Sequence, residues 1–492
     1  MPANLYDEIS YPTQAHAQTH PDRLATMATL FGMNPAPVQK CRVLEIGCGN
    51  GWNLIPMAYA LPNSEFLGID LASEPIARGN EAITALGLAN IRLVAQDLME
   101  FNGAHGEFDY IVTHGLYAWV PDPVRDRILE VSKAHLAPQG VAFISYNANP
   151  GGRIRQLVRE IMLYHAGAIA DPLQRLQQGI AFLEFTANCR TDQDPWLPLA
   201  RAELEKLTER VPGVVLHDEL ADIYEPVYFN EFAAHAGRHG LQYLSEAIFP
   251  EMHAGSLPAA TQKRLRELSG GDFMAYEQYL DFAKFRKFRQ TLLCHSNAAV
   301  DRVPKPESFR NLHISSPVYR TDPEPGSAPD VVRFQGFGGA SASTNNPMIK
   351  AVLGKLIDVF PLSASFQDLL AFADAETLAD LLMKLYGARL AELHSHCPPI
   401  APMPGERPKA SDVARYQAGI GKFVTTLRHG HVLIEDEIGR GLLQLLDGTR
   451  DRAALLDALK SAGVSAGDLN SQLDASLKHL TMLALLLEQP QS

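Results

Sequence analysis

The chain has 492 residues, 46% of them hydrophobic, and its 56 acidic against 43 basic residues give a formal net charge of −13 at pH 7. This length is more than one hydrophobic core usually serves, so we expect two or three domains. The acidic balance argues against nucleic acid as a partner, because phosphate binding needs a basic face, and it leaves room for a lysine-bearing protein partner.

The cysteines and the N-terminus indicate the compartment. The cysteines are odd in number, scattered and without C-x-x-C spacing: Cys41, Cys48, Cys189, Cys294 and Cys397. This pattern is typical of a reducing compartment and predicts neither a disulfide framework nor a metal site. Residues 1–13 lack a basic region followed by an apolar run, and no stretch reaches ~18 uninterrupted apolar residues. We therefore expect a cytoplasmic protein without a signal peptide or a membrane span.

The first predicted element is a helix over 21–31. Pro21 suits its first turn, and Thr19 or His20 suits its N-cap. The segment just before the helix has two interpretations, which the sequence leaves open. It is either a plain helix cap or a lid whose Gln18 and His20 contact a bound cofactor.

A glycine turn between a strand and a helix is the most informative feature of the chain. A short apolar strand over 42–46 runs into Gly47, Gly49 and Gly51, and helix-like residues follow over 53–60. In an open α/β sheet this arrangement presents backbone N–H groups to a nucleotide-like ligand.

Two features of the turn indicate which ligand it suits. Dinucleotide-binding loops read G-x-G-x-x-G, whereas here the glycines are spaced as G-x-G-x-G. Glu45, two residues before the first glycine, would repel a pyrophosphate but suits a cationic group such as the ammonium of a methionine moiety. The pattern E-x-G-x-G resembles motif I of the class I S-adenosylmethionine methyltransferases. The alternative is a glycine-rich turn without a ligand.

The following strands provide further ligand-binding candidates. A second strand is expected over 65–69, and it ends at Asp70, 19 residues after the last glycine of the turn, which is close to the ~20-residue spacing of a ribose-binding acid. A third strand over 91–95 is followed by Gln96 and Asp97, and the Asp97 carboxylate is able to accept from an adenine amino group.

Two more strands complete a parallel sheet. A fourth strand over 108–113 ends at His114 and Gly115, and a fifth is expected over 141–146. Strands that alternate with helical stretches indicate right-handed βαβ units and an α/β fold. Four candidate cofactor-binding elements lie at four successive strand ends. A coincidence of this kind is far rarer than a chance match to any one motif.

After the fifth strand the chain becomes helical. A sixth strand is expected over 240–245, and a helix over residues 278–290 is expected to pass into an antiparallel seventh strand. Phenylalanines at 282, 285 and 288 alternate there with lysines and arginines. A nucleic-acid contact is one interpretation. We favour the other, a solvated helix face with buried phenylalanines.

The composition shifts to Pro, Ser, Gly and Asp over 301–346, which we take as a linker with short strands over 312–319 and 331–336. Residues 347–492 are mostly helical. A short strand over 431–434 near a helix–turn–helix resembles a winged-helix module. In an acidic protein it is more readily an interaction or dimerisation domain than a DNA reader.

Together these motifs resemble the bacterial methyltransferases that carry a methyltransferase regulatory domain, of which the rickettsial protein-lysine methyltransferases are the best-known members. The likeness covers residues 1–300 well. It rests on Tyr6-Asp7-Glu8 with Tyr11-Pro12, Gln18 to Leu24, Leu44 to Gly49, Asn53 to Ala58, Thr113-His114-Gly115, Trp119-Val120-Pro121, Ser145-Tyr146-Asn147 with Pro150-Gly151, Arg159 to His165, and Arg286 to Leu293. One departure is Gly152, where a bulky aromatic residue is expected.

The resemblance implies a class I seven-stranded, mostly parallel sheet with a helical insertion and a mainly helical C-terminal domain. We expect an S-adenosylmethionine-binding core over 1–150, a regulatory region that completes the sheet over 151–300, the linker over 301–346, and the C-terminal domain over 347–492. It further implies S-adenosylmethionine as cofactor, a homodimer, and a protein substrate with exposed lysines, such as an envelope protein.

The expected site follows from the strand ends and the motifs together. The expected cofactor-binding residues are Gln18, His20, Glu45, Gly47, Cys48, Gly49, Gly51, Asn53, Asp70, Leu71, Gln96, Asp97, Leu98, His114 and Gly115. The expected catalytic residues, which would line the acceptor channel, are Tyr117, Trp119, Tyr146 and Asn147. For Trp119 core packing is an equal alternative. Two alternatives to lysine methylation remain: methylation of a small molecule, and a regulatory protein that binds the cofactor without catalysis.

Overall fold

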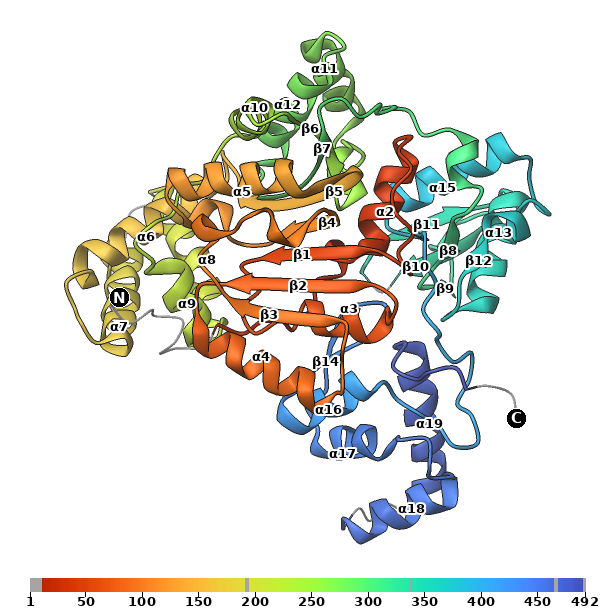
Figure 1. Ribbon diagram of the computed structural model, residues 1–492. Helices are drawn as coiled ribbons and strands as arrows, with labels where there is room; N and C mark the ends of the chain where they lie inside the picture. The colour runs from red at the N-terminus through yellow and green to blue at the C-terminus, as the bar shows by residue number, and fades with distance from the viewer. Residues whose placement is uncertain (1–10, 191–193, 337, 464–467, 490–492) are drawn as a thin grey trace.

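A seven-stranded sheet organises the N-terminal half of the computed structural model, which describes residues 11–190, 194–336, 338–463 and 468–489 (Figure 1). The strand order is β3-β2-β1-β4-β5-β7-β6, and β7 alone runs antiparallel to its neighbours β5 and β6. The strands are β1 (Arg42–Ile46), β2 (Glu65–Asp70), β3 (Ile91–Ala95), β4 (Phe108–Thr113), β5 (Leu136–Asn147), β6 (Leu241–Glu246) and β7 (Phe288–His295). The expected class I sheet is confirmed.

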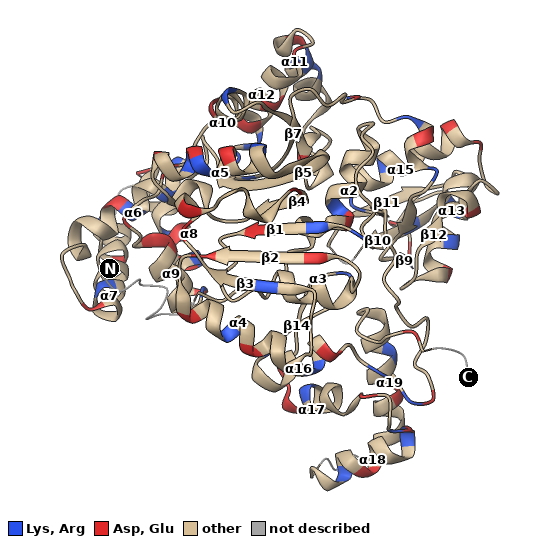
Figure 2. Cartoon of the chain, viewed as in Figure 1, with Lys and Arg blue, Asp and Glu red and all other residues tan. Residues whose placement is uncertain are grey.

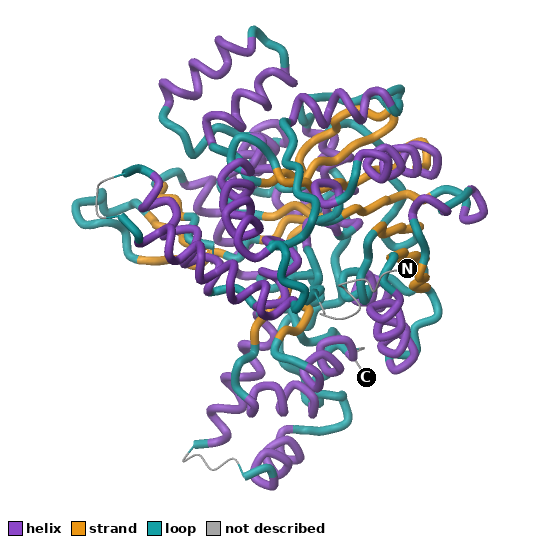
Figure 3. Tube along the Cα trace, turned by 90° about the vertical axis from the view of Figure 1, so that its left-hand side faces the viewer, coloured by secondary structure: helices purple, strands orange, loops and turns teal. Residues whose placement is uncertain are grey.

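Helices cover both faces of this sheet (Figure 3). Those of the core are α2 (Pro21–Leu30), α3 (Leu54–Ala60), α4 (Ser73–Ala85) and α5 (Asp122–His135). His20 caps α2, because its Nδ1 accepts from the backbone N–H of Asp22 at 3.1 Å. Apolar side chains of α2, β1 and β4 share one large buried cluster. Strands β3, β2, β1 and β4 are adjacent and parallel, so their carboxyl ends form one continuous edge. An open α/β sheet binds its ligands at this edge.

A helical region lies between β5 and β7. It contains α6 (Gly152–Ala166), α7 (Pro172–Asn188), α8 (Trp196–Thr208), α9 (Pro212–Glu219), α10 (Phe229–Arg238), α11 (Ala259–Ser269) and α12 (Phe273–Lys284). The first four helices enclose a small apolar core of their own around Met162 and Leu183. None of the described helices is both long and apolar enough to cross a membrane.

The burial of side chains in the segment over 278–290 is the reverse of what we expected. Phe282, Phe285 and Phe288 are 48%, 48% and 36% exposed, whereas Arg286 and Arg289 are buried. The reason is a group of buried acids from β6 and α12, which hold both guanidinium groups by ion pairs. The expectation of buried phenylalanines was wrong, because the sequence pattern does not show that buried acidic residues are available to pair with the arginines.

Two small sheets follow the seven-stranded sheet in sequence. One has the order β11-β10-β9 and the other β12-β8-β13. Their strands are β8 (His313–Ser315), β9 (Val318–Thr321), β10 (Val332–Gly336), β11 (Ser341–Thr344), β12 (Ala364–Ser365) and β13 (Glu392–His394), with α13 (Pro347–Val359), α14 (Phe366–Leu369) and α15 (Ala375–Gly387) packed around them. Their apolar side chains belong to the same buried cluster as α2.

The C-terminal domain is a winged helix, as expected. It consists of α16 (Asp412–Ile420), the hairpin β14 (Phe423–Thr425) and β15 (His431–Leu433), α17 (Glu437–Leu445), α18 (Arg452–Ser461) and α19 (Leu469–Met482). Leucines fill its separate core. Acidic and basic residues are interspersed along α17, α18 and α19 (Figure 2).

Candidate active site

The glycine turn after β1 has backbone angles and close side-chain neighbours that favour glycine. Gly47, Gly49 and Gly51 have φ of +77°, +55° and +75°, which side-chain-bearing residues rarely adopt. A Cβ at Gly51 would lie 2.6 Å from Leu93 Cδ1. The N–H of Gly49 donates to Asp70 Oδ2 at 2.7 Å, so the turn and the end of β2 are held together.

Glu45 is a buried acid with one unsatisfied oxygen. Its Oε1 accepts from Asn53 Nδ2 at 2.8 Å, whereas Oε2 is buried without a hydrogen-bond partner among the described residues. Burial raises the pKa of Glu45 to about 8, the Asn53 hydrogen bond opposes the rise, and the charge of Asp70 adds to it. A cationic amine would satisfy the free oxygen and stabilise the carboxylate, so the turn fits an amino-acid-bearing ligand such as S-adenosylmethionine.

Asp70 and Asp97 stand at the ends of adjacent strands, since Asp70 pairs with Ala95 across β2 and β3. Both Asp70 oxygens accept from backbone N–H groups, of Gly49 and Ala72, which fixes the carboxylate. Asp97 is exposed, and its Oδ1 accepts from the Met99 N–H at 2.9 Å. A carboxylate has about four acceptor sites, so each acid keeps capacity for a hydroxyl or an amine.

The hydrophobic and amide neighbours of these acids are placed differently. Leu71 is 59% exposed, whereas Leu98 and Cys48 are buried. The backbone N–H of Gln96 donates to the Asp70 carbonyl at 2.8 Å, which continues the pairing of β2 and β3. Cofactor contacts of these four residues stay predictions.

Asn53 joins three distant parts of the chain by using all four of its hydrogen-bonding positions. Its Nδ2 donates to Glu45 Oε1 at 2.8 Å and to Thr19 Oγ1 at 2.9 Å. Its Oδ1 accepts from the backbone N–H of His16 at 2.9 Å and from His429 Nε2 at 3.0 Å. The orientation of this amide, and with it the Glu45 carboxyl, therefore depends on the N-terminal segment and on the C-terminal domain.

The segment before α2 lies over the glycine turn. The Thr13 hydroxyl donates to Asn50 Oδ1 within the turn. The His16 ring lies 4.1 Å from the His114 ring. His20 caps α2 and faces His429 at 5.0 Å, so the capping interpretation holds for His20. A cofactor contact of Gln18 or His20 stays a prediction, and Tyr6-Asp7-Glu8 lies outside the described residues.

His114 and Gly115, which follow β4 directly, are held together by Ser145 of β5. Ser145 Oγ lies 3.0 Å from His114 Nδ1 and accepts from the Gly115 N–H at 2.8 Å. Burial, together with the nearby His16, lowers the pKa of His114 to about 3. The imidazole is therefore neutral at physiological pH, and Nδ1 or Nε2 keeps an acceptor lone pair.

Tyr117 and Tyr146 are both buried in the core on one side of the sheet, with ring centroids 5.9 Å apart. Tyr146 stacks on Phe232 at 4.2 Å, and its hydroxyl lies 3.2 Å from Thr291 Oγ1. The Tyr117 hydroxyl lies 2.7 Å from His235 Nδ1. These contacts tie both tyrosines to the regulatory region, and their place in an acceptor channel stays a prediction.

Trp119 and Asn147 lie nearby in different surroundings. The Trp119 ring packs 4.9 Å from Tyr224, and Arg155 and Arg159 lie over it at 5.2 and 5.5 Å. The Trp119 ring is thus already in contact with two arginines, which favours the packing interpretation for this residue. Asn147 is buried at the end of β5, and its carbonyl accepts from the Val227 N–H at 3.1 Å.

Three polar residues of the site were not expected from the sequence: His16, Ser145 and His429. Ser145 could have been predicted, because successive side chains on a strand point to opposite faces, and the prediction considered only the face to which Tyr146 points. His16 lies in the loop before the helix cap, where neither periodicity nor a motif marks a single residue. His429 lies 376 residues from its partner Asn53, and the sequence holds no sign of this contact.

Known proteins resemble this chain over most of its length. Residues 43–140 match the family described as a methyltransferase domain, residues 212–295 the predicted methyltransferase regulatory domain, and residues 406–481 the C-terminal winged helix domain of PKMT. An uncharacterized protein of Rickettsia prowazekii is 31% identical over 480 residues, which cover 93% of this chain and 85% of that protein. The chain belongs to the class I S-adenosylmethionine-dependent methyltransferases that carry a methyltransferase regulatory domain.

A solved structure supports the assignment of this methyltransferase. PKMT2 from Rickettsia typhi superposes with a TM-score of 0.85 at 27% identity, covering 97% of this chain and 100% of that chain. A second structure of PKMT2, in complex with AdoHcy, gives the same TM-score and covers 99% of that chain. The cofactor of this methyltransferase is S-adenosylmethionine, as expected.

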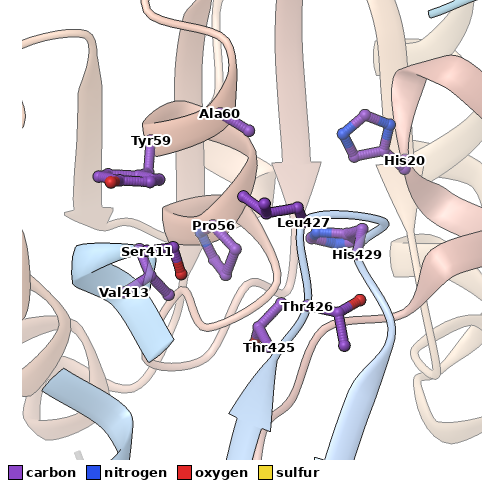
Figure 4. A pocket seen from close by; sticks show the side chains of 10 residues that line it. All are labelled: His20, Pro56, Tyr59, Ala60, Ser411, Val413, Thr425, Thr426, Leu427 and His429. Carbon is purple, nitrogen blue, oxygen red and sulfur yellow. The ribbon is translucent and has the colours of Figure 1, made fainter. Parts of the chain in front are cut away.

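The winged-helix domain reaches the core of the methyltransferase with the tip of its hairpin. His429, at this tip, is buried and adopts φ +60°, a conformation that costs a residue other than glycine of the order of 1 kcal/mol. Figure 4 shows Thr425, Leu427 and His429 of the hairpin facing His20 and Pro56 across a narrow pocket. The C-terminal domain is thus packed against the start of α3, beside the cofactor turn.

We predict that His429→Ala weakens S-adenosylhomocysteine binding about threefold to tenfold, since the loss of one hydrogen bond of about 1 kcal/mol loosens Asn53 and Glu45. Isothermal titration calorimetry measures the change. His431→Ala is the matched control, because His431 lies on the same hairpin but is exposed. Equal affinities for His429→Ala and the parent protein would contradict the prediction.

Gly152, where an aromatic residue was expected, is closely packed. A Cβ at this position would lie 2.6 Å from Pro226 Cβ. We predict that Gly152→Ala lowers the free energy of unfolding by about 1–3 kcal/mol, because the Pro226 ring, which is rigid, has to move away. Urea denaturation tests this. Gly237→Ala is a suitable control, since a Cβ there meets nothing within 4 Å.

Proposed function

We propose that this methyltransferase transfers methyl groups to lysine side chains of a protein, an envelope protein being our first candidate, and that it works as a homodimer. The observation that supports this most directly is the likeness to PKMT2 along 97% of the chain, together with the match of residues 406–481 to the PKMT winged helix.

The strand-end residues would hold the cofactor in an extended form along the edge of the sheet. Glu45 would pair with the ammonium of the methionine moiety, Asp70 would accept from the ribose hydroxyls, and Asp97 from the adenine amino group. The glycine turn would let the backbone approach the ligand closely. When bound, the cofactor supplies a methyl group that is already activated by its sulfonium charge.

His114 and Ser145 would border the reacting centre. A free lysine has a pKa of about 10.4, so the acceptor amine has to lose a proton before it attacks. The pKa of His114, about 3, makes this imidazole too weak a base to remove it. We infer that partial desolvation under the N-terminal segment and the nearby sulfonium charge lower the amine pKa instead, while Ser145 holds His114 and Gly115 in place.

Radiolabelled cofactor tests this proposal. The purified chain is incubated with it and with a bacterial cell-envelope extract, and label is expected on protein bands. In a matched extract whose lysines have been blocked by acetylation, which removes the nucleophilic lone pair of the amine, protein labelling is expected to disappear. Label in the small-molecule fraction would favour a metabolite acceptor, and binding without transfer would favour a regulatory protein. Asp70→Ala serves as the cofactor-binding control, and analytical ultracentrifugation tests the homodimer.

A further inference from the structure

Three potential metal ligands converge where α5 meets α10. His235 and His239 lie four residues apart at the C-terminal end of α10, so their rings share one face of the helix, with centroids 5.2 Å apart. Asp126 of α5 faces both rings: its Oδ1 lies 2.6 Å from His235 Nε2 and 3.1 Å from His239 Nε2. One atom of each residue lies within 4.8 Å of the other two.

A hydrogen bond orients the inner histidine. Nδ1 of His235 lies 2.7 Å from the hydroxyl of the buried Tyr117, which leaves Nε2 directed at Asp126. Metal-binding histidines are typically held in this way through their second nitrogen. The side chains of His235 and His239 are only 12% and 17% exposed, whereas that of Asp126 is 51% exposed. The cluster is therefore preorganised on its inner side and open to solvent on its outer side.

We propose that Asp126, His235 and His239 bind a zinc ion, with a water molecule as the fourth ligand. Two imidazoles and one carboxylate form a recurrent ligand set for zinc that leaves one position open. Zinc–ligand bonds of about 2.0–2.1 Å in a tetrahedron place neighbouring ligand atoms about 3.3 Å apart. The observed Nε2–Oδ1 distances of 2.6 and 3.1 Å need only a small widening, which the half-exposed Asp126 is free to make.

The protons balance without a further reactant. In the metal-free protein a proton lies between His235 Nε2 and Asp126 Oδ1, because two bare acceptors would repel at 2.6 Å. Zinc takes the place of this proton, and the neutral His235 ring carries its single proton on Nδ1 instead. The Nδ1–H then donates a hydrogen bond to the Tyr117 hydroxyl. His239 binds zinc through Nε2 in the same way, and its ring proton, which lies between Nε2 and Asp126 in the metal-free protein, moves to Nδ1 by exchange with solvent. The Tyr117 hydroxyl thereby changes from donor to acceptor.

The ion would connect two domains. Asp126 lies within the stretch that matches the methyltransferase domain, and both histidines lie within the match to the methyltransferase regulatory domain. Zinc would therefore fix α10 against α5 and hold Tyr117 between them. We infer that it stabilises the arrangement of the two domains and sets the hydrogen bonding of a residue expected near the acceptor.

The test uses the full chain without an affinity tag, stripped of metal and titrated with zinc alone against a chromophoric chelator. We expect one zinc ion per chain. His235→Gln, His239→Gln and Asp126→Asn are each expected to lower the affinity at least tenfold, whereas His479→Gln, an exposed histidine in α19, leaves it unchanged. Cobalt in place of zinc is expected to give the strong visible absorption of a four-coordinate ion, which the three variants lose.

Folding and metal binding are separable in this design. The amide variants are still able to form hydrogen bonds in the cluster, so their circular dichroism and metal-free Tm are expected to match those of the parent. Zinc is expected to raise the Tm of the parent chain and of His479→Gln only, since an ion that binds the folded state stabilises it. The absence of zinc binding, or equal zinc binding by all variants, would overturn the proposal.

Discussion

Binding of S-adenosylhomocysteine is expected to strengthen about thirtyfold between pH 5.5 and pH 7.0, because Glu45 has to lose a proton before it pairs with the ammonium of the ligand. Burial raises the pKa of free Glu45 to about 8, so its ionised fraction rises nearly tenfold per pH unit in this range. His16 and His114, which face the site, keep pKa values of about 4 and about 3 and stay neutral. Calorimetry in buffers of different ionisation enthalpy measures both the affinity and the proton released.

Glu45→Gln is the matched control for this pH dependence. Glutamine has the same shape and is still able to accept from Asn53, but it carries no charge and does not titrate. The variant is expected to bind S-adenosylhomocysteine at least tenfold more weakly than the parent at pH 7.0, with a pH dependence of about twofold or less. A parent protein with equal affinity at both pH values, or a variant with the parent's slope, would show that Glu45 does not face the ammonium.

Arg289→Met is expected to lower the free energy of unfolding by about 3–5 kcal/mol. Arg289 is fully buried and pairs with Glu246 at 2.6 Å, Glu277 at 3.0 Å and Asp281 at 2.8 Å, and its guanidinium also lies over the Phe229 ring. Methionine fills much of the volume but leaves three buried acids without this cation. Urea denaturation at pH 8 measures the loss.

The pH dependence of this loss distinguishes charge from packing. Burial raises the pKa of Glu277 to about 7 even beside Arg289, and the variant raises it further. The folded variant then binds more protons than its unfolded chain, so its stability falls as the pH rises, and the deficit is expected to be smaller at pH 5.5 than at pH 8. Arg264→Met, on the exposed face of α11, is expected to change stability by less than about 0.5 kcal/mol. A deficit independent of pH would point to packing alone.

The sheet could be predicted from the sequence because its signals are local. Strands β1, β3 and β4 begin and end at the predicted residues, since each apolar run is bounded by a turn or a polar residue. The fifth strand was predicted from residue 141, whereas β5 begins at Leu136. Its first residues contain a proline and a glycine, which usually mark a turn, and their pairing with β4 is a long-range contact that composition does not reveal.

The candidate site was predictable only where a motif fixes position and chemistry together. The geometry of Glu45, Asn53 and Asp70 follows from the glycine turn and the parallel register, so the sequence was sufficient to bring them together. Buried charge was not predictable in the same way. Arg289 and its three acids come from β6, α12 and β7, and a sequence pattern shows where a charge is but not which element covers it.

The buried hairpin tip has a consequence for how this family can be engineered and how it diversifies. A chain cut near residue 400 would lose His429 and leave a hole beside α3, so the N-terminal four-fifths would not behave as an independent catalytic fragment. For the same reason the C-terminal domain is not an exchangeable cassette. A chimaera that imports this domain from a relative would need a compatible pair at positions 53 and 429, and we expect substitutions at these two positions to accompany one another.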